Sequence, residues 1–496
     1  MRSHLTPVLV AVLSLCTAIQ PAQAQRKQIS PVAQTGPEIR STLGLTGRSG
    51  WMLMDLDTNE VLDQGSADRG FAPASVAKLP TAAFALDALG PDYRFTTSLV
   101  ANGSIAGGRV KGDLILKGSG DPELDTDALM PLVSRLSARG IKGVDGRFGV
   151  DASALPQTAE IEPSQAVDAS YNPSVSGLNL NFNRVHLKWD ARSGRNRISV
   201  EAEAEDLSPP VDGIRVALND DPSAPLFTLR QRNGREDWLM ARRAFKGAAA
   251  RWLPVKNPAT YAGEVFRTLS GRAGLKVPVA VPLRAPENAE ELAIHQSRPL
   301  GNILRDMLRF STNVTAEATG AAASRAVGMA VDNLRGSANV MNAWASIVAG
   351  FDINDPGFQF VNHSGLTLNS RVTPRRMVEL LAALGRRAPD PGAAHSRLPG
   401  GIAGYLKRHN VAAKAVPLDY DRLEVVAKTG TMSYVRGLAG YIATPNGRRL
   451  AFAIFSNDLA RRSGGAEKVN RRWMGKAKGF ERSLIRNWVM KHDKAR

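Results

Sequence analysis

Three short motifs, far apart in this chain of 496 residues, must meet in space if they serve one site. In chain order they are Ser75–Lys78 (Ser-Val-Ala-Lys), Ser311–Asn313 (Ser-Thr-Asn) and Lys428–Gly430 (Lys-Thr-Gly). Each is weak evidence alone, because short patterns also occur by chance. Their order and settings indicate an acyl-transfer site in which a serine attacks a carbonyl. The fold must therefore bring three distant segments together.

The two outer regions of the chain have similar patterns. Residues 50–56 read as a strand, and residues 75–89 as a helix that Gly90 ends. After the middle of the chain, residues 300–308 show the spacing of one helix face, and residues 423–455 read as strands joined by a tight turn. These elements predict a sheet with helices packed on it.

The middle of the chain, residues 96–290, has a different texture. Short β-like runs such as 113–116 and 184–189 alternate with glycine-rich turns. This pattern predicts an insertion of β-rich modules into a domain made by the two outer regions. A long insertion costs little loop-closure entropy if its ends lie close together.

The first motif predicts an activated serine. Serine needs an adjacent base, and Lys78 lies three residues after Ser75, on the same helix face. The pKa of Lys78 must then be lowered by burial and by positive charge, which Lys428 can supply. The alternative is an N-cap serine followed by a surface lysine, but the other motifs favour catalysis. Pro80 requires this helix to start late or to kink.

The second motif lies in a loop between two predicted helices. The Ser311 hydroxyl can relay a proton to a leaving amine, and the Asn313 amide can hold a substrate amide. The alternative is that Ser311 or Thr312 caps the next helix, which is compatible with function.

The third motif ends a predicted strand. Gly430 allows close approach to the backbone, and a strand edge offers N–H and C=O groups to an extended peptide. Lys428 and Thr429 can bind a carboxylate. A backbone N–H near Thr431, with that of Ser75, can form an oxyanion hole. The alternative, a strand-end turn with a solvated lysine, is disfavoured by the hairpin that follows.

The first 24 residues predict a signal peptide. Basic Arg2 precedes an apolar run too short to span a membrane, and Ala22–Ala24 has the small-x-small pattern of a cleavage site. We expect cleavage after Ala24 and export to the periplasm. The only cysteine, Cys16, follows the bulky Leu15, which argues against a lipid anchor. The mature chain then has no disulfide and no thiol nucleophile.

The net charge of +18 predicts attraction to polyanions, such as cell-wall polymers and anionic lipid headgroups. Nucleic acid is disfavoured because the chain shows an export signal and no nucleic-acid motif. The seven histidines show no metal-ligand spacing, so we expect neither a metal nor a cofactor. Basic residues 470–496 contain interleaved aromatic residues. They predict a helix packed on the sheet, with weak membrane-surface contact as the alternative.

Beyond these patterns, the chain resembles the D-alanyl-D-alanine carboxypeptidases/endopeptidases, low-molecular-mass penicillin-binding proteins with domains inserted between the first two motifs. The resemblance covers nearly all of the mature chain. The segments that carry it are Pro73–Lys78, Gly112–Pro122, Tyr171–Pro173, Leu178–Asn183, Ser311–Asn313 with Ala316 and Glu317, Ser364–Leu366, Val372–Pro374, Lys428–Thr431 and Leu438–Tyr441.

The resemblance implies an α/β (α+β) fold. A transpeptidase/β-lactamase-like domain, with an antiparallel sheet and helices on both faces, would be interrupted by two nested β-rich inserted domains. The catalytic domain would comprise residues 25–95 and 292–496. The first inserted domain would comprise 96–183 and 256–291, with the second, 184–255, nested within it.

The resemblance also implies a serine acyl-enzyme hydrolase of peptidoglycan stem peptides, acylated by β-lactam antibiotics and without a cofactor. It would remove terminal D-alanine, cleave D-Ala–diaminopimelate cross-links, or both. Ser75 would be the nucleophile, Lys78 its base and Ser311 a proton-transfer group. The implied substrate-binding residues are Asn313, Lys428, Thr429, Gly430 and Thr431.

Two positions depart from the family pattern or stay open. Asn362 and His363 stand before Ser364 where the family has Asp-Gly, which questions the geometry of that turn, and His363 is expected in a loop. Asp168 is a candidate for an acidic inserted residue near the substrate.

Three other functions compete with this interpretation. A β-lactamase is disfavoured by the long insertion and by the lack of a glutamate motif for the deacylating water. A non-catalytic wall-binding scaffold is disfavoured because all three motifs are intact. A secreted esterase is a weaker option.

Overall fold

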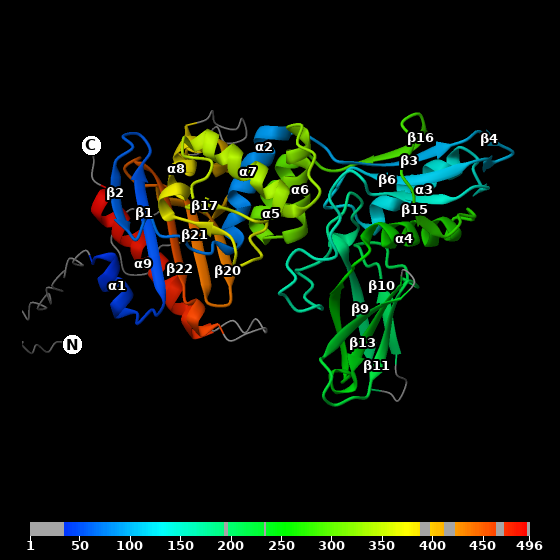
Figure 1. Cartoon of the computed structure of the whole chain (residues 1–496), viewed down its shortest axis with the longest axis horizontal. Helices are drawn as coiled ribbons and strands as arrows, with labels where there is room; N and C mark the ends of the chain where they lie inside the picture. Colours follow the sequence, from blue (N-terminus) through cyan, green and yellow to red (C-terminus); the bar gives the residue numbers. More distant parts are fainter. Residues whose placement is uncertain are drawn as a thin grey trace, which may run out of the picture.

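The computed structural model describes residues 34–192, 197–232, 235–386, 397–410, 422–462 and 471–493. The predicted signal peptide lies outside these residues. A six-stranded antiparallel sheet has the order β19-β20-β21-β22-β1-β2 (Figure 1). Its strands are β1 (Arg48–Asp55), β2 (Val61–Gly65), β19 (Lys407–Arg408), β20 (Glu424–Met432), β21 (Val435–Ala443) and β22 (Arg449–Asn457). The two outer regions therefore share one sheet, as expected.

Helices cover both faces of this sheet (Figure 1). Alternate side chains of β1 point to opposite faces, so Trp51 and Leu53 belong to one core and Met52 and Met54 to the other. The first core contains residues of α1 (Gly36–Thr42) and α9 (Arg471–His492), and the second those of α2 (Lys78–Leu89), α5 (Leu300–Phe310), α6 (Asn313–Ala326), α7 (Leu334–Ala349) and α8 (Pro374–Gly385).

The C-terminal helix packs on the sheet as predicted. Its apolar side chains, including Phe480, Leu484, Ile485 and Trp488, are buried in the core with Trp51. This face of α9 is therefore occupied by the sheet. No described helix is long and apolar enough to cross a membrane.

The helix after Ser75 starts late. A 3₁₀ turn, η1 (Ala74–Ala77), holds Ser75, and α2 begins only at Lys78. Pro80 is therefore the third residue of α2, where backbone N–H groups lack an intrahelical acceptor in any case. The proline thus costs no helix hydrogen bond. Gly90, with φ of 80°, ends the helix where predicted.

The middle of the chain forms separate sheets beside the six-stranded sheet and its helices (Figure 1). It also contains two helices that the sequence analysis did not predict, α3 (Thr126–Ala138) and α4 (Pro258–Arg272). The strands are β3 (Thr96–Asn102), β4 (Ile105–Ala106), β5 (Arg109–Val110), β6 (Asp113–Gly118), β7 (Gly143–Val144), β8 (Phe148–Asp151), β9 (Arg184–Asp190), β10 (Arg197–Glu201), β11 (Ile214–Asn219), β12 (Phe227–Arg232), β13 (Arg235–Ala241), β14 (Ala248–Pro254), β15 (Ala280–Pro282) and β16 (Glu290–Gln296). The domain boundaries stay a prediction.

The remaining short elements connect these parts. They are the strands β17 (Phe358–Gln359) and β18 (Arg371–Val372) and the 3₁₀ turns η2 (Asn181–Asn183), η3 (Arg242–Ala244), η5 (Gly401–Tyr405) and η7 (Leu459–Arg461).

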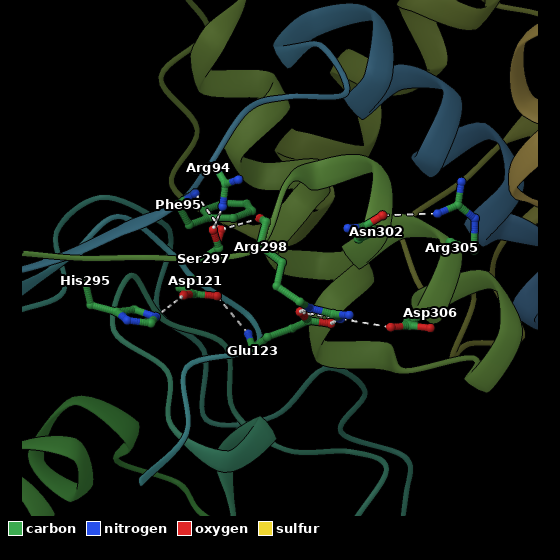
Figure 2. A network of polar contacts seen from close by, with 10 residues as sticks. All are labelled: Arg94, Phe95, Asp121, Glu123, His295, Ser297, Arg298, Asn302, Arg305 and Asp306. Carbon is green, nitrogen blue, oxygen red and sulfur yellow. Dashed lines mark hydrogen bonds and ion pairs between the residues drawn. The ribbon is translucent and has the colours of Figure 1, made fainter. Parts of the chain in front are cut away.

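The chain enters and leaves the middle region through adjacent strands. β3 and β16 pair antiparallel, with Gln296 opposite Thr96. The Ser297 side chain accepts a hydrogen bond from the Phe95 backbone N–H at 2.9 Å (Figure 2). The ends of the insertion are therefore close together, which keeps its loop-closure cost low.

An ion network ties the middle region to the helix before Ser311. Figure 2 shows Arg298 between Glu123 and Asp306. Its guanidinium nitrogen Nη2 lies 2.8 Å from an oxygen of each carboxylate. Because Asp306 lies on α5, the network links the loop after β6 to the helix that ends at Ser311.

Candidate active site

Three polar groups, from three separate segments of the chain, meet at the amine of Lys78. Its Nζ lies 3.1 Å from Ser75 Oγ, 2.7 Å from Asn313 Oδ1 and 2.7 Å from the backbone oxygen of Ser364. The Lys78 side chain is fully buried, whereas Ser75 is partly exposed. The structure therefore brings the first two motifs into direct contact.

The partners of Lys78 suit a neutral amine. Burial lowers the pKa of Lys78 well below its ordinary value, and the charge of Lys428 lowers it further, while Glu317 acts in the opposite direction. Asn313 Oδ1 and Ser364 O can only accept, so Lys78 donates both of those bonds. In a neutral amine, the remaining lone pair faces Ser75 Oγ. It can accept the hydroxyl proton, which is what a general base requires.

The turn with the unexpected Asn362-His363 pair is well held. Asn362 Oδ1 accepts from the Gly365 backbone N–H at 2.9 Å, and the buried Glu317 carboxylate accepts from the backbone N–H of Ser364 at 2.8 Å. Gly365 has a φ of 71°, and a Cβ there would collide with the Ala74 carbonyl oxygen. The turn thus presents the Ser364 carbonyl to Lys78 while packing directly against η1.

His363 lies in the expected loop but is completely buried. Its Nε2 lies 2.8 Å from the Ser337 hydroxyl, and its backbone oxygen accepts from Thr81 Oγ at 2.9 Å. Burial lowers the pKa of His363 to about 3, so the ring is neutral at physiological pH. These contacts make it a packing residue beneath the site.

The second and third motifs also meet. Lys428 Nζ donates to Ser311 Oγ at 3.0 Å and to the Thr429 backbone oxygen at 2.7 Å. Burial lowers the pKa of Lys428 to about 7, and the charges of Arg436 and Lys407 add to the effect. Ser311 is held at the end of α5 in a left-handed conformation with φ of 63°.

The end of β20 is an open strand edge. Within the part of the chain that the structure describes, β19 pairs only with Val426 and Ala427, so Lys428–Met432 has no strand neighbour on that side. A Cβ at Gly430 would collide with the Pro73 carbonyl oxygen just before η1. Glycine therefore lets β20 lie against the segment that carries Ser75, with partly exposed Thr429 and exposed Thr431 beside it.

The middle region reaches the site at Tyr171. Asn313 Nδ2 donates to the backbone oxygen of Tyr171 at 2.7 Å. Asp168 binds Arg251, with 2.9 Å between the carboxylate and guanidinium. Its carboxylate is therefore engaged within the middle region. No cluster of potential metal ligands was found among the described residues.

A family model described as D-Ala-D-Ala carboxypeptidase 3 (S13) matches residues 25–474. The chain belongs to this S13 family. Both the predicted family and the predicted class of serine-type D-Ala-D-Ala carboxypeptidase are thereby confirmed.

Two curated proteins illustrate the similarity of this S13 chain to known carboxypeptidases. It is 25% identical over 425 residues to the D-alanyl-D-alanine carboxypeptidase DacB of Haemophilus influenzae, covering 82% of this chain and 85% of that protein. It is 27% identical over 436 residues to a D-alanyl-D-alanine carboxypeptidase of an Actinomadura species, covering 82% and 77%.

The crystal structure of penicillin binding protein 4 (dacB) from Haemophilus influenzae has the same fold. The TM-score is 0.73 at 22% identity, with 92% of this S13 chain and 99% of that chain covered. The fold class expected from the sequence is confirmed.

Several contacts of this S13 site could not be predicted from the sequence. Ser364 and Glu317 stand out there only as part of the family pattern, and no motif contains Arg436. These residues act through a backbone carbonyl, a buried carboxylate and a partner on the adjacent strand. The one signal for Arg436 is the register of the hairpin, which places Arg436 opposite Thr431.

Proposed function

We propose that this S13 protein hydrolyses peptidoglycan stem peptides through an acyl-enzyme on Ser75, with release of terminal D-alanine. The observation that carries the proposal is the buried Lys78 amine, 3.1 Å from Ser75 Oγ, with its other partners both acceptors. A base held neutral beside a partly exposed serine is the arrangement that activates a hydroxyl nucleophile.

Acylation begins with transfer of the Ser75 hydroxyl proton to Lys78 Nζ. Ser75 Oγ then bonds to the carbonyl carbon of the penultimate D-alanine. The Ser75 backbone N–H has no acceptor among the described residues, which leaves it available to the developing oxyanion. With an N–H at Thr431, it forms the proposed oxyanion hole.

The leaving group departs as the amine of D-alanine. The C–N bond breaks, and the proton taken from Ser75 passes to the leaving nitrogen through the Ser311 hydroxyl. Lys428 donates to Ser311 Oγ, which leaves the single hydroxyl proton of Ser311 free for this relay. Water then hydrolyses the ester and restores Ser75.

Substrate binding falls to the remaining motif residues. Asn313, whose amide faces both Lys78 and the middle region, contacts the peptide amide. The open edge of β20, which includes Gly430, pairs with the extended peptide. Lys428 and Thr429 bind its terminal carboxylate. Cleavage of a D-Ala–diaminopimelate cross-link uses the same acylation and differs only in the leaving group.

A β-lactamase of class A uses a glutamate that activates water for fast deacylation. Glu317, the carboxylate whose charge acts on Lys78, is fully buried and already binds two backbone N–H groups. It is therefore not placed to activate solvent water, which favours slow deacylation of a penicillin adduct.

The first experiment is an intact-mass time course of the mature protein with excess benzylpenicillin, followed by drug removal. We expect a stable gain of one penicillin, absent in Ser75→Ala, and Ser75-dependent release of D-alanine from a pentapeptide. Rapid loss of the adduct with drug turnover would instead indicate a β-lactamase. No adduct at all would reject the acyl-enzyme.

We also propose export to the periplasm with cleavage near Ala24, and weak attraction of the basic surface to anionic envelope polymers or lipid headgroups. The small-x-small pattern and the charge of +18 support this proposal. N-terminal sequencing of the protein from the cell envelope tests it, and a start at Met1 would contradict it.

A further inference from the structure

Arg436 connects the C-terminal helix to the edge of the active site. It is the second residue of β21 and lies opposite Thr431 of β20. Its Nε and Nη2 donate to the two oxygens of Glu481 on α9 at 2.8 and 2.9 Å, and its Nη1 donates to Thr431 Oγ at 2.9 Å. The side chains of Arg436 and Glu481 are 9% and 5% exposed.

This geometry orients both Arg436 and Thr431. The two parallel bonds to Glu481 hold the planar guanidinium in one direction. Thr431 Oγ already accepts from Arg436, and a hydroxyl has only one proton of its own. That proton is therefore free to be donated elsewhere, and Thr431 is exposed at the open end of β20.

The charge around this point favours an anion. The positive charge of Arg436 acts on Lys428, whose pKa it lowers together with burial and Lys407. Lys78 and His409, whose pKa values burial lowers, also feel the charge of Lys428 but favour their neutral forms. A ligand carboxylate at the end of β20 would offset the charges of Lys428, Arg436 and Lys407.

We infer that Arg436, held by Glu481, is a positioning residue for the terminal carboxylate of the substrate and acts through the hydroxyl of Thr431. The inference rests on the proposed acyl-enzyme function and deepens it, because it makes α9 part of substrate recognition. The carboxylate would receive the Thr431 hydroxyl proton and lie in the field of Arg436.

The test compares two acylating probes, benzylpenicillin and its methyl ester, which lacks the free carboxylate. The test variant is Arg436→Gln with Glu481→Gln, because removing one charge alone would leave the other buried and unpaired. We expect the ratio of acylation efficiencies, acid over ester, to fall about 10- to 100-fold, the value of one or two lost hydrogen bonds to a charged group. An unchanged ratio in a folded variant would overturn the inference.

The pH profile provides a readout that a merely structural role would not move. Without the charge of Arg436, the pKa of Lys428 rises, so the alkaline limb of acylation by benzylpenicillin should move to higher pH. Arg449→Gln is the matched control, since Arg449 lies farther along the same sheet and pairs with Asp57. Arg449→Gln should leave unchanged both the acid-over-ester ratio of acylation efficiencies and the alkaline limb of acylation by benzylpenicillin. An unmoved limb in the double variant would contradict the inference, whereas absence of any adduct in the parent would reject the proposed function.

Discussion

At the residue scale, the proposed mechanism depends on a neutral Lys78 amine. Burial and the charge of Lys428 favour the neutral amine, while Glu317 favours the ammonium. The neutral amide of Asn313, 2.7 Å from Nζ, accepts a hydrogen bond without adding a negative charge. Small changes of charge around this amine should therefore change activity without large changes in shape.

Asn313→Asp tests this dependence with little change of size. A carboxylate beside Nζ stabilises the ammonium and should raise the pKa of Lys78. The acid limb of kcat/KM for D-alanine release should therefore move to higher pH, with a loss of about 10-fold or more at pH 7. Asn302→Asp on α5 is the control, and an unmoved acid limb would contradict the role of Lys78 as base.

Lys428 should determine how kcat/KM for D-alanine release changes at alkaline pH. Its folded-state pKa of about 7 means that it loses its proton, and with it its attraction for a carboxylate, as the pH rises through 7. We expect kcat/KM for D-alanine release to decline above about pH 7, since kcat/KM reports ionisations of the free enzyme. Lys428→Arg, which stays charged, should remove this decline. A parent profile that stays flat to pH 9 would refute the prediction.

At the scale of elements, the site is formed by close backbone packing around η1. The turn at Gly365 approaches Ala74 on one side, and β20 at Gly430 approaches Pro73 on the other. Both approaches require the absence of a Cβ. The positions of Ser75 and Lys78 therefore depend on glycines that carry no chemistry themselves.

Gly365→Ala should displace η1. Both a left-handed conformation and a collision with Ala74 oppose the added methyl group. We expect a loss of about 2–5 kcal/mol in the free energy of unfolding and a marked decrease in penicillin acylation. Gly350→Ala is the matched control: Gly350 has φ of 76° but no atom within 4 Å of its added Cβ. Denaturant unfolding should show that Gly350→Ala loses only about 1–2 kcal/mol in the free energy of unfolding. Equal losses in the two variants would show that the collision with Ala74 adds nothing to the effect of Gly365→Ala.

At the scale of the whole molecule, charged and buried groups join the middle region to the catalytic one (Figure 2). Asp121 is almost completely buried, accepts from the Glu123 backbone N–H at 2.9 Å and lies 3.8 Å from His295 Nε2. Burial raises the pKa of Asp121 to about 7 and lowers that of His295. Burial thus drives both groups toward their neutral forms despite their proximity.

This junction should make stability depend on pH. The folded state keeps the Asp121 proton up to about pH 7, whereas the unfolded chain loses it near pH 4. The free energy of unfolding should therefore fall as the pH rises from about 4 to about 7, by about 4 kcal/mol at most from this group. The free energy of unfolding of Asp121→Asn, taken relative to that of the parent, should be higher at pH 8 than at pH 5. Urea unfolding at several pH values measures this difference. If the free energy of unfolding of Asp121→Asn varied with pH in parallel with that of the parent, as expected for the exposed control Asp332→Asn, the prediction would be contradicted.

Much of the fold could be predicted because it follows from local patterns. The strand at 50–56, the helix ending at Gly90 and the hairpin at 423–455 correspond to β1, α2 and the β20–β22 strands. Pro80 also predicted that the helix after Ser75 starts late or kinks, and α2 begins only at Lys78. The helices α3 and α4 were less accessible, because helices within a β-rich segment depend on packing that short-range periodicity does not report.

The class of chemistry can be read from the amino-acid sequence: three motifs in order, a serine with a lysine three residues later, and membership of a family whose pattern spans the chain. The ionisation states of those groups depend on how the chain folds. Burial of Lys78, the Ser364 carbonyl that binds it and the Glu481–Arg436–Thr431 chain all arise from contacts between segments far apart in sequence. Desolvation and charge proximity depend on distance in space, so the ionisation of the site is a property of the fold.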